Sequence, residues 1–512
     1  MATITRNHPT RRQILTGASA MAFTLAGGIA KPYVSRAASR PLITHGIQSG
    51  DICGDAAVVW ARTDRPARMV VEASTTESFT DIFDVRTADA LPKTDFATKV
   101  LLQNVPAGQD VFYRVRFDDL SSPTIAGEAQ IGQFRAAPNA NRDISFVWSG
   151  DCAGQGWGID ESRGGIRTYA TMLRNTPDFF IHCGDSIYAD EPIHSEQKLP
   201  GGEIWKNLTV EEKAKAAETL ADYRGNHKYT FLDRNVRAFH AKVPMYAQWD
   251  DHEVRDDWCP GAADEQHLRK LVAHGRRAFY EFKPVRPVSP EAARIYRRIS
   301  YGPLLDIFLL DMRSYRTPIA GKERSVILGA EQLSWLKQEL RASQATWKVI
   351  ATDQPMGVAT TDTIGQGDGP VTGREFEIAE LLSFIKQAHI QNTVWITADL
   401  HYTAALYFDP NNAVFQDFEP FWGFISGPLH AGTWTPRPLD NTFGPLLVYQ
   451  KACEKENLAP CFGLQFFGHV AIDGETEVMT VTLKDVDDNN LWSTRIEPHK
   501  QRWSGGTQAG RT

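Results

Sequence analysis

The stretch Phe179–Asp190 reads FFIHCGDSIYAD and joins a short, largely apolar run to a turn that carries two carboxylates and a phenol. A run of five such residues bounded by glycine is typical of a buried strand. The residues after Gly184 then lie at a strand end, which is where the active sites of α/β sheets are found. The stretch therefore predicts an α/β fold with a functional group at this edge.

Three further segments repeat this arrangement. Strand-length runs starting at Ile144, Met245 and Thr393 lead into SGDC (149–152), WDDHE (249–253) and ADLHY (398–402). Asp oxygens and His nitrogens suit Fe, Mn, Zn or Ca, and a carboxylate that bridges two ions can hold a dinuclear centre for phosphoryl transfer. Each patch alone could be a turn or a helix cap. Together, the four patches predict one metal site that catalyses hydrolysis.

Residues 1–38 differ from the rest of the chain. Arg11 and Arg12 open a weakly apolar stretch rich in Gly and Ala that runs to Ala30, and small residues follow around Ala37. This pattern resembles a twin-arginine export signal that is cleaved near Ala37 or Ala38. A permanent membrane anchor is the alternative, but the glycines and hydroxyls make the stretch too mild for one. We expect a periplasmic or secreted protein that meets the twin-arginine translocase during export.

The charge balance argues against a stable nucleic-acid partner. The 512 residues carry a formal net charge of -7, and residues 1–38 contribute five Lys or Arg but no Asp or Glu. The remaining chain is therefore more acidic still, whereas binding to a phosphate backbone needs a basic face. An acidic enzyme can nevertheless act on phosphate esters when bound cations reverse the local field.

The six cysteines are too few for a disulfide scaffold in a chain of this length. Cys453 and Cys461 are close enough in the sequence to bridge a short loop in an oxidising compartment, but spacing alone does not establish pairing. This disulfide is left open.

Residues 41–137 are predicted to form an all-β sandwich of immunoglobulin or fibronectin type. Short alternating segments such as Ala56–Ala61 and Val111–Phe117 are separated by Pro, Gly and Asp. A linker at 136–142 follows, and strands then alternate with amphipathic helices through 140–497, which indicates an α/β layered domain. Residues 498–512 are expected to be a polar tail.

Three helices have clear start signals. Thr209 opens Thr-Val-Glu-Glu, the pattern of a capping box. Ala330 and Glu375 begin segments in which Leu, Trp, Phe and Ile recur at three- and four-residue spacing.

The blocks GDSIYAD (184–190), WDDHEVRDDW (249–258), LLDMRSYR (309–316) and ADLHY, in this order, resemble the PhoD-like alkaline phosphatase D family, a branch of the calcineurin-like metallophosphoesterases. HGIQSGD (45–51) and VVWAR (58–62) are similar to the opening of that family. The resemblance covers nearly the whole chain. It implies a four-layer α/β/β/α catalytic domain after the β sandwich, hydrolysis of phosphate monoesters or diesters, and a cluster of Fe³⁺ and Ca²⁺, with Mn or Zn possible.

The same resemblance implies roles for individual residues. Asp185 would bridge the metals, Tyr188 would supply a phenolate ligand to the iron, and His252 would contact phosphate or leaving-group oxygen. Asp250 or Glu253 could orient these groups. The implied metal ligands are Asp151, Asp185, Tyr188, Asp251, Asp399 and His401, and the implied catalytic residues are His252, Asp185 and Arg313.

Two positions leave alternatives open. Relatives can place a cysteine in the first block, and this chain offers both Asp151 and Cys152; alignment along the preceding strand favours Asp151. A thiolate would soften the iron, whereas an oxygen and nitrogen shell keeps it harder. Arg313 could clamp a phosphate through its guanidinium fork, or it could form a structural salt bridge.

The expected function is an exported metal-dependent phosphoesterase in which a metal-bound hydroxide attacks phosphorus. One alternative is a phosphodiesterase or phospholipase D-like enzyme for phospholipid or nucleotide diesters, with an entrance shaped by the insert at 194–240. Another is a secreted binding protein that metals stabilise without turnover. His252 and His401 argue against the latter, because a structural calcium site uses oxygen ligands.

Overall fold

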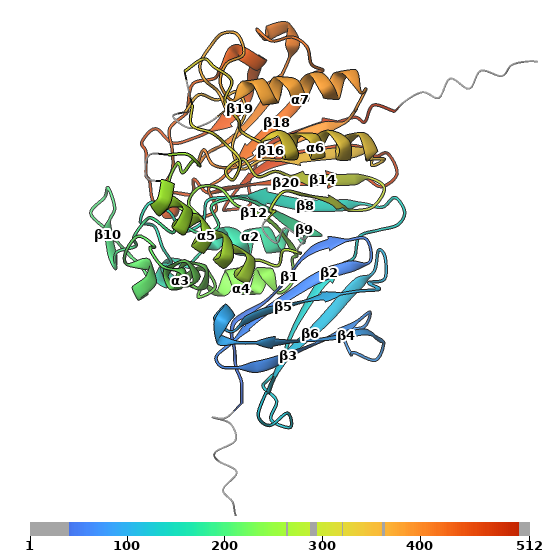
Figure 1. Ribbon diagram of the computed structural model, residues 1–512, viewed down its shortest axis with the longest axis vertical. Helices are drawn as coiled ribbons and strands as arrows, with labels where there is room; N and C mark the ends of the chain where they lie inside the picture. Colours follow the sequence, from blue (N-terminus) through green and yellow to red (C-terminus); the bar gives the residue numbers. More distant parts are fainter. Residues whose placement is uncertain (1–39, 263–264, 287–293, 320, 361–363, 501–512) are drawn as a thin grey trace, which may run out of the picture.

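The computed structural model describes residues 40–262, 265–286, 294–319, 321–360 and 364–500 (Figure 1). The expected export signal at 1–38 lies outside these residues, as does most of the expected polar tail. None of the helices in the described ranges is both long enough and apolar enough to cross a membrane.

Seven strands form the N-terminal part of the molecule, at the bottom of Figure 1. They are β1 (Ile43–Cys53), β2 (Ala56–Thr63), β3 (Ala67–Ser74), β4 (Ile82–Ala90), β5 (Ala97–Leu102), β6 (Asp110–Asp119) and β7 (Gln130–Arg135). The antiparallel sheet β4-β3-β6-β7 faces β1, β2 and β5. Val59 and Leu102 on one side pack in the same core as Val71 and Val115 on the other. Inward apolar residues therefore hold two β layers together.

The smaller of these layers continues into the rest of the molecule. β1 runs parallel to β12 (Met245–Gln248), with Gly50 opposite Met245. A Cβ atom on Gly50 would lie 2.3 Å from the Met245 carbonyl oxygen, so the close approach requires glycine. One nine-stranded sheet, in the order β22-β21-β20-β8-β9-β12-β1-β2-β5, thus joins both parts of the chain.

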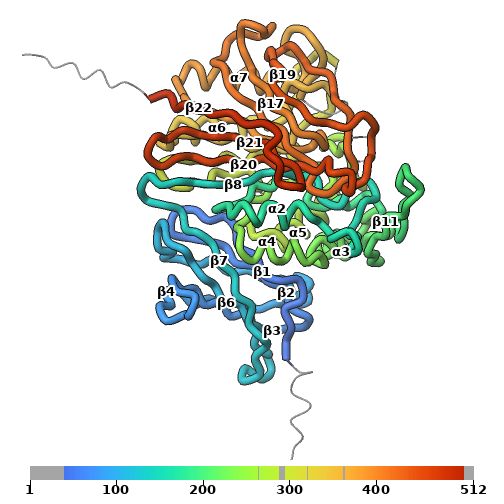
Figure 2. The backbone as a smooth tube through the Cα atoms, turned by 180° about the vertical axis from the view of Figure 1, so that it is seen from behind, coloured from blue at the N-terminus to red at the C-terminus, as the bar shows by residue number. Residues whose placement is uncertain are grey.

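The other strands of this sheet are β8 (Ile144–Ser149), β9 (Phe179–Cys183), β20 (Phe466–Ile472), β21 (Met479–Asp485) and β22 (Asn490–Ile496). Figure 2 shows β20, β21 and β22 beside β8 from behind. A second sheet contains β13 (Arg297–Ser300), β14 (Leu305–Leu309), β15 (Trp347–Ala351), β16 (Thr393–Thr397), β17 (Thr403–Phe408), β18 (Phe421–Ser426) and β19 (Pro445–Lys451). Both sheets are parallel at their centres, with antiparallel strands outside.

Helices cover the outer faces of the two sheets (Figure 1). On the nine-stranded sheet lie α2 (Arg167–Arg174), α3 (Leu220–Thr230), α4 (Arg234–His240) and α5 (Glu265–Phe282), and on the other sheet lie α6 (Ala330–Ala342) and α7 (Glu375–Gln387). A short ribbon is formed by β10 (Glu196–Lys198) and β11 (Ile204–Lys206). The chain therefore has the expected mixed α/β fold with large sheets.

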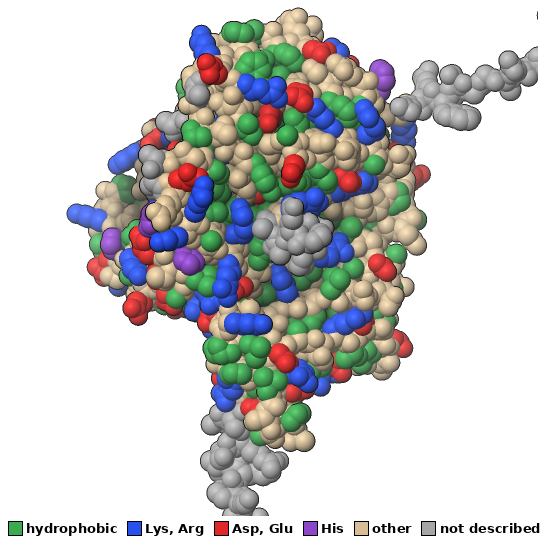
Figure 3. Space-filling model, viewed as in Figure 1, with side chains coloured by type: hydrophobic (Ala, Val, Ile, Leu, Met, Phe, Trp, Pro, Cys, Tyr) green, Lys and Arg blue, Asp and Glu red, His purple; other side chains and the backbone are tan. Residues whose placement is uncertain are grey.

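Three groups of buried side chains hold this arrangement together. Phe146 and Ile307 belong to a core that the two sheets share. Phe180 packs with helical side chains such as Phe279 on one outer face, and Ile350 packs with those of α6 and α7 on the other. The space-filling view in Figure 3 shows charged side chains of both signs over the outside of these elements.

Two of the three helix starts are confirmed, and one is wrong. α6 and α7 begin at Ala330 and Glu375 as expected. Instead of a helix at Thr209, residues 211–213 form a single 3₁₀ turn. The capping box of the next helix is at Thr219, whose side chain accepts from the backbone of Asp222 while Asp222 caps in return. Lys213 is buried with its ammonium against the Tyr188 carbonyl, and this contact fixes the turn in place of a helix.

Candidate metal centre

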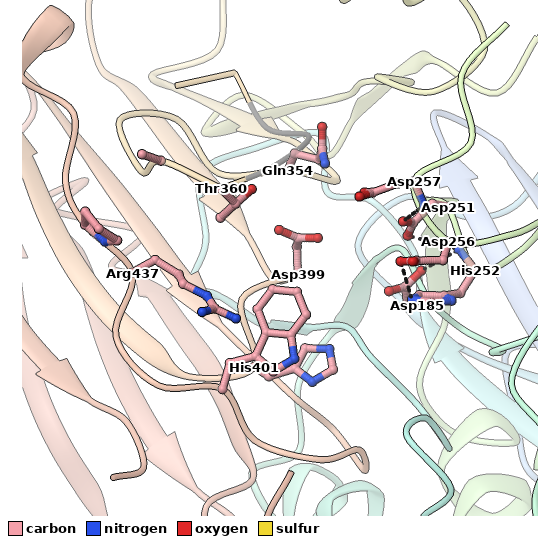
Figure 4. A pocket seen from close by; sticks show the side chains of 13 residues that line it. Asp185, Asp251, His252, Asp256, Asp257, Gln354, Thr360, Asp399, His401 and Arg437 are labelled. Carbon is pink, nitrogen blue, oxygen red and sulfur yellow. Dashed lines mark hydrogen bonds and ion pairs between the residues drawn. The ribbon is translucent and has the colours of Figure 1, made fainter. Parts of the chain in front are cut away.

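The four patches come together where the two sheets meet. SGDC, GDSIYAD and WDDHE follow β8, β9 and β12, which are parallel neighbours, and ADLHY follows β16 of the other sheet. Asp185, Asp251, His252, Asp399 and His401 from these patches line a cavity of about 620 Å³. Figure 4 shows Asp399 and His401 on one side of this cavity and Asp185, Asp251 and His252 on the other. Its volume is that of a small-molecule site.

The backbone is strained at four positions within the four patches. Asp151, Asp185, Asp399 and His401 have φ angles of 64°, 52°, 66° and 51°. Such left-handed conformations are uncommon outside glycine, although Asp and His adopt them more often than most residues. Strained residues of this kind cluster at functional sites.

A first group of ligand atoms comes from Asp151, Asp185 and His401, which each offer one atom within 4.8 Å of the others. The Tyr188 hydroxyl lies 2.8 Å from Nε2 of His401. His401 donates from Nδ1 to the Gly432 carbonyl at 2.5 Å, which leaves Nε2 to face Tyr188. Carboxylate, phenol and imidazole thus converge at one point, as the resemblance implied.

One atom of this group shows that a cation fits. Oδ2 of Asp151 is buried and has no hydrogen-bond partner among the described residues. A buried carboxylate oxygen without a partner is costly, and a metal ion would satisfy it. The thiol of Cys152 lies elsewhere, in the core under the helices with Tyr169. Of the two first-block candidates, Asp151 therefore faces the site.

A second group of ligand atoms comes from Asp185, Asp251 and His252. Asp185 belongs to both groups, which is the position of a bridging carboxylate. A hydrogen bond to Asp190 fixes the orientation of the His252 ring, because Nδ1 of His252 lies 2.8 Å from Oδ1 of Asp190. Its ring also packs on Tyr188 with 4.2 Å between centroids. Asp190 ends the GDSIYAD block, yet its role as the partner of His252 was not anticipated from the sequence.

Three carboxylates of the site, those of Asp185, Asp151 and Asp399, disfavour negative charge. Asp251 differs, because Arg313 and His252 outweigh its burial and lower its pKa. Burial raises the pKa of Asp185 well above its usual range, and Asp251 and Asp250 add to this effect. Burial and Asp250 do the same to the pKa values of Asp151 and Asp399. Only cations would allow so many buried carboxylates to ionise together near neutral pH. Metal ions thus suit both the donor atoms and the electrostatics.

Glu253 connects the patches through their backbone. Its carboxylate accepts hydrogen bonds from the amides of Asp185 at 3.0 Å, Ser186 at 2.6 Å and Asp250 at 2.8 Å. The ends of β9 and β12 are therefore held in a fixed relation. Glu253 acts by orienting the groups beside it, which was one of the roles left open.

Arg313 requires a correction. Its Nε lies 2.5 Å from Oδ1 of Asp250, its Nη2 lies 3.4 Å from Oδ2 of Asp251, and its side chain is 1% exposed. It is not among the residues that line the cavity. The structure thus gives Arg313 the structural ion pair rather than the phosphate clamp, because buried carboxylates engage its guanidinium. Its expected catalytic role becomes a positioning role.

Asp399 takes part in a different way from the other expected ligands. It lines the cavity but is in neither ligand group. Its backbone opposes the burial that raises the pKa of Asp151, so it also acts on a ligand of the first group.

The outer walls of the cavity come from segments that the sequence analysis did not single out. Gln354, Ala359 and Thr360 follow β15, and residues 434–438 precede β19. The insert at 194–240, expected to shape the entrance, contributes no lining residue. The segment after β15 carried the same strand-end signal as the four patches, whereas 434–438 follows no strand.

The six cysteines are free, so Cys453 and Cys461 do not pair.

The fold and this site define a phosphoric ester hydrolase that binds metal. The chain belongs to the PhoD-like phosphatase family, whose model matches residues 146–483, while the model of the family's N-terminal domain matches residues 28–138. Alkaline phosphatase D of Bacillus subtilis (strain 168) is 26% identical over 430 residues, which cover 76% of this chain and 68% of that protein.

Two solved structures share the fold. The structure of PhoD has a TM-score of 0.65 at 20% identity and covers 90% of this chain and 93% of that one. The purple acid phosphatase PPD1 from yellow lupin seeds has a TM-score of 0.55 at 11% identity, with 90% and 74% covered.

Proposed function

We propose that this protein is an exported phosphatase of the alkaline phosphatase D type, which hydrolyses phosphate monoesters, phosphate diesters or both. The observation that carries the proposal is the place of Asp185 in both ligand groups. A carboxylate in that position would contribute to holding two cations, and a pair of cations would stabilise the attacking and leaving oxygens of an in-line displacement. The two sheets and their helices would correspond to the α/β/β/α layers that the resemblance implies.

The residues divide the work as follows. Asp151, Tyr188 and His401 would hold one ion, Asp185 both ions, and Asp251 the second, with Asp399 beside them. A phenolate ligand favours ferric iron and the remaining carboxylates suit Ca²⁺, while Mn or Zn would fit the same donors. When bound, the metals act as Lewis acids and lower the pKa of coordinated water.

His252 would donate a proton to the departing oxygen. It lines the cavity, and its Nδ1 is held by Asp190. Asp190, Asp251 and Asp185 outweigh burial and raise the pKa of His252 well above its usual range. This direction favours the protonated imidazole, which is the form that a general acid needs.

Turnover of matched esters tests this function. The metal-loaded protein should hydrolyse an aryl phosphate monoester, the matching diester or both, and a chelator should abolish the activity until metal is restored. Preference for the monoester would support a phosphatase, and preference for the diester would support a phosphodiesterase or phospholipase D-like activity. Chelator-resistant turnover, or metal binding without any turnover, would contradict the proposal.

Export is the second part of the proposal, with the twin-arginine translocase as the transient partner and the periplasm or medium as the destination. Arg11 and Arg12 are the residues that it depends on. Replacement of both by Lys should keep the protein in the cytoplasm, as fractionation and immunoblotting would show. Unchanged export of this variant would rule out the twin-arginine route.

A further inference from the structure

The outer wall of the cavity carries an unassigned cation. Among the described residues that line the cavity, Arg437 is the only Lys or Arg. It faces the cavity from the side that also carries Asp399 and His401 (Figure 4). The opposite rim is acidic, with Asp256 71% exposed and Asp257 47% exposed. A bound molecule with a second negative charge would be repelled from that rim and attracted to Arg437.

Stacked rings fix the position of Arg437. Its guanidinium lies 4.8 Å from the ring centre of Trp434, and the Trp434 ring stacks on His401 with 5.0 Å between centroids. The Trp434 ring thus contacts both the guanidinium and a metal-ligand candidate. Because the contacts among the described residues connect the guanidinium to His401 only through this ring, Arg437 would contact a group of the substrate beyond the phosphorus rather than the phosphoryl group itself.

The Arg437 guanidinium can exchange its present partner, the Glu456 carboxylate, for an anionic ligand. Nη1 forms an ion pair with Oε1 of Glu456 at 3.0 Å, and Glu456 is 51% exposed. Within the described part of the chain, Nε and Nη2 of Arg437 have no ion-pair or hydrogen-bond partner. Exposed ion pairs of this kind are weak, so an anionic ligand can displace the carboxylate. The planar fork of arginine matches the oxygens of a carboxylate or phosphate.

We propose that Arg437 forms an anion subsite that selects phosphate esters whose alcohol carries a second negatively charged group, such as a carboxylate or another phosphate. The subsite rests on the proposed phosphoesterase function. Trp434 supports the guanidinium and Glu456 competes with the ligand for it. Arg437 therefore sets substrate preference, while the chemistry remains at the metal centre.

Two esters of equal size test this subsite: 4-carboxyphenyl phosphate and its neutral analogue 4-carbamoylphenyl phosphate. The readout is the ratio of their KM values in each variant, since this ratio cancels general changes in the enzyme. Arg437→Gln should reduce the preference for the charged ester about tenfold or more, because a hydrogen-bonded charge contact is lost. Arg437→Lys should retain part of the preference.

Replacement of Glu456, whose carboxylate competes for Arg437, should change the preference for the charged ester in the opposite direction. Glu456→Gln should increase the preference for the charged ester, because it frees the guanidinium. Arg167→Gln, which alters a surface ion pair with Asp487, should leave the preference unchanged. An unchanged KM ratio in Arg437→Gln, or an equal loss for both esters, would overturn the subsite.

Failure of the subsite can be told from failure of the proposed function. Wild-type turnover of the neutral ester tests the function alone, and the KM ratio tests the subsite. If neither ester is turned over, calorimetric dissociation constants of the two esters replace KM. The same dependence on Arg437 is expected in those constants, and its absence would again overturn the subsite.

Discussion

At the scale of single residues, the site depends on which carboxylates face the cavity and which ones form hydrogen bonds to the side chains that line it. Asp190 and Asp256 both lie near His252, but they differ in contact and exposure. Asp190 is 2.8 Å from Nδ1 and mostly buried, whereas Asp256 is 3.8 Å from Nε2 and 71% exposed. Buried charges act on a neighbour far more strongly than exposed ones. Asp190 should therefore dominate the proton affinity of His252.

Replacement of Asp190 by Asn tests this difference. Since Asp190 helps to raise the pKa of His252, its removal should lower that pKa, and the protonated form should be lost at lower pH. The alkaline limb of the kcat–pH profile should shift to lower pH, and kcat should fall about 10- to 100-fold. Asp256→Asn should change the profile little. Coincident alkaline limbs for wild type and Asp190→Asn would contradict the role given to His252.

At the scale of elements, a buried ion pair connects β1 to β13. Arg297 lies 2.6 Å from Oδ1 of Asp51, and both side chains are 1% exposed. Arg297 also donates to the carbonyls of Ala247 and Ile295 at 3.0 Å. Its removal leaves the buried Asp51 carboxylate without its counter-ion, with the Arg286 amide still donating to it, and such losses cost about 3–5 kcal/mol.

Urea unfolding of Arg297→Met should show that loss of stability. Arg68→Ala is the matched control, because Arg68 pairs with Asp89 at 2.8 Å on the surface, where its side chain is 52% exposed. Exposed pairs of this kind contribute little to stability. Equal unfolding free energies for the two variants would show that the buried pair does not join the elements.

Gly50 tests the junction of β1 and β12 independently. A Cβ atom there would lie 2.3 Å from the Met245 carbonyl oxygen and 2.7 Å from Cγ of Pro284. Gly50→Ala should destabilise the fold by about 1–3 kcal/mol through overpacking. Gly201→Ala meets nothing within 4 Å and should be near neutral. A thermal unfolding midpoint that moves equally in both variants would contradict the tight junction.

At the scale of the whole molecule, the sequence predicted the features that a local pattern of residues encodes, such as strands and their ends. Apolar runs ending at Gly184 and Trp249 located the strand ends, because buried parallel strands and the polar residues after them are contiguous in the chain. The continuation of the β1 layer into the larger sheet was not foreseen, since a single pairing at Gly50 leaves no periodic signal.

Residue roles that depend on tertiary contacts could not be predicted from the sequence either. Arg313 had the residue type of a phosphate clamp, but its side chain faces Asp250 and Asp251 instead of the cavity. Trp434 and Arg437 lie in a segment without strand-end character, so nothing in the sequence joined them to His401. The tertiary contact between Trp434 and His401 brings that wall to the metal centre.

The central claim is that Asp185 holds two metal ions in a phosphoesterase site. The most direct measurement is the metal content per chain together with aryl phosphate turnover, compared between wild type and a folded Asp185→Asn variant. The account predicts two or more bound metal ions in the wild type, loss of metal in the variant, and a fall in turnover of at least about 10³-fold. Full metal content with full turnover in Asp185→Asn would contradict it.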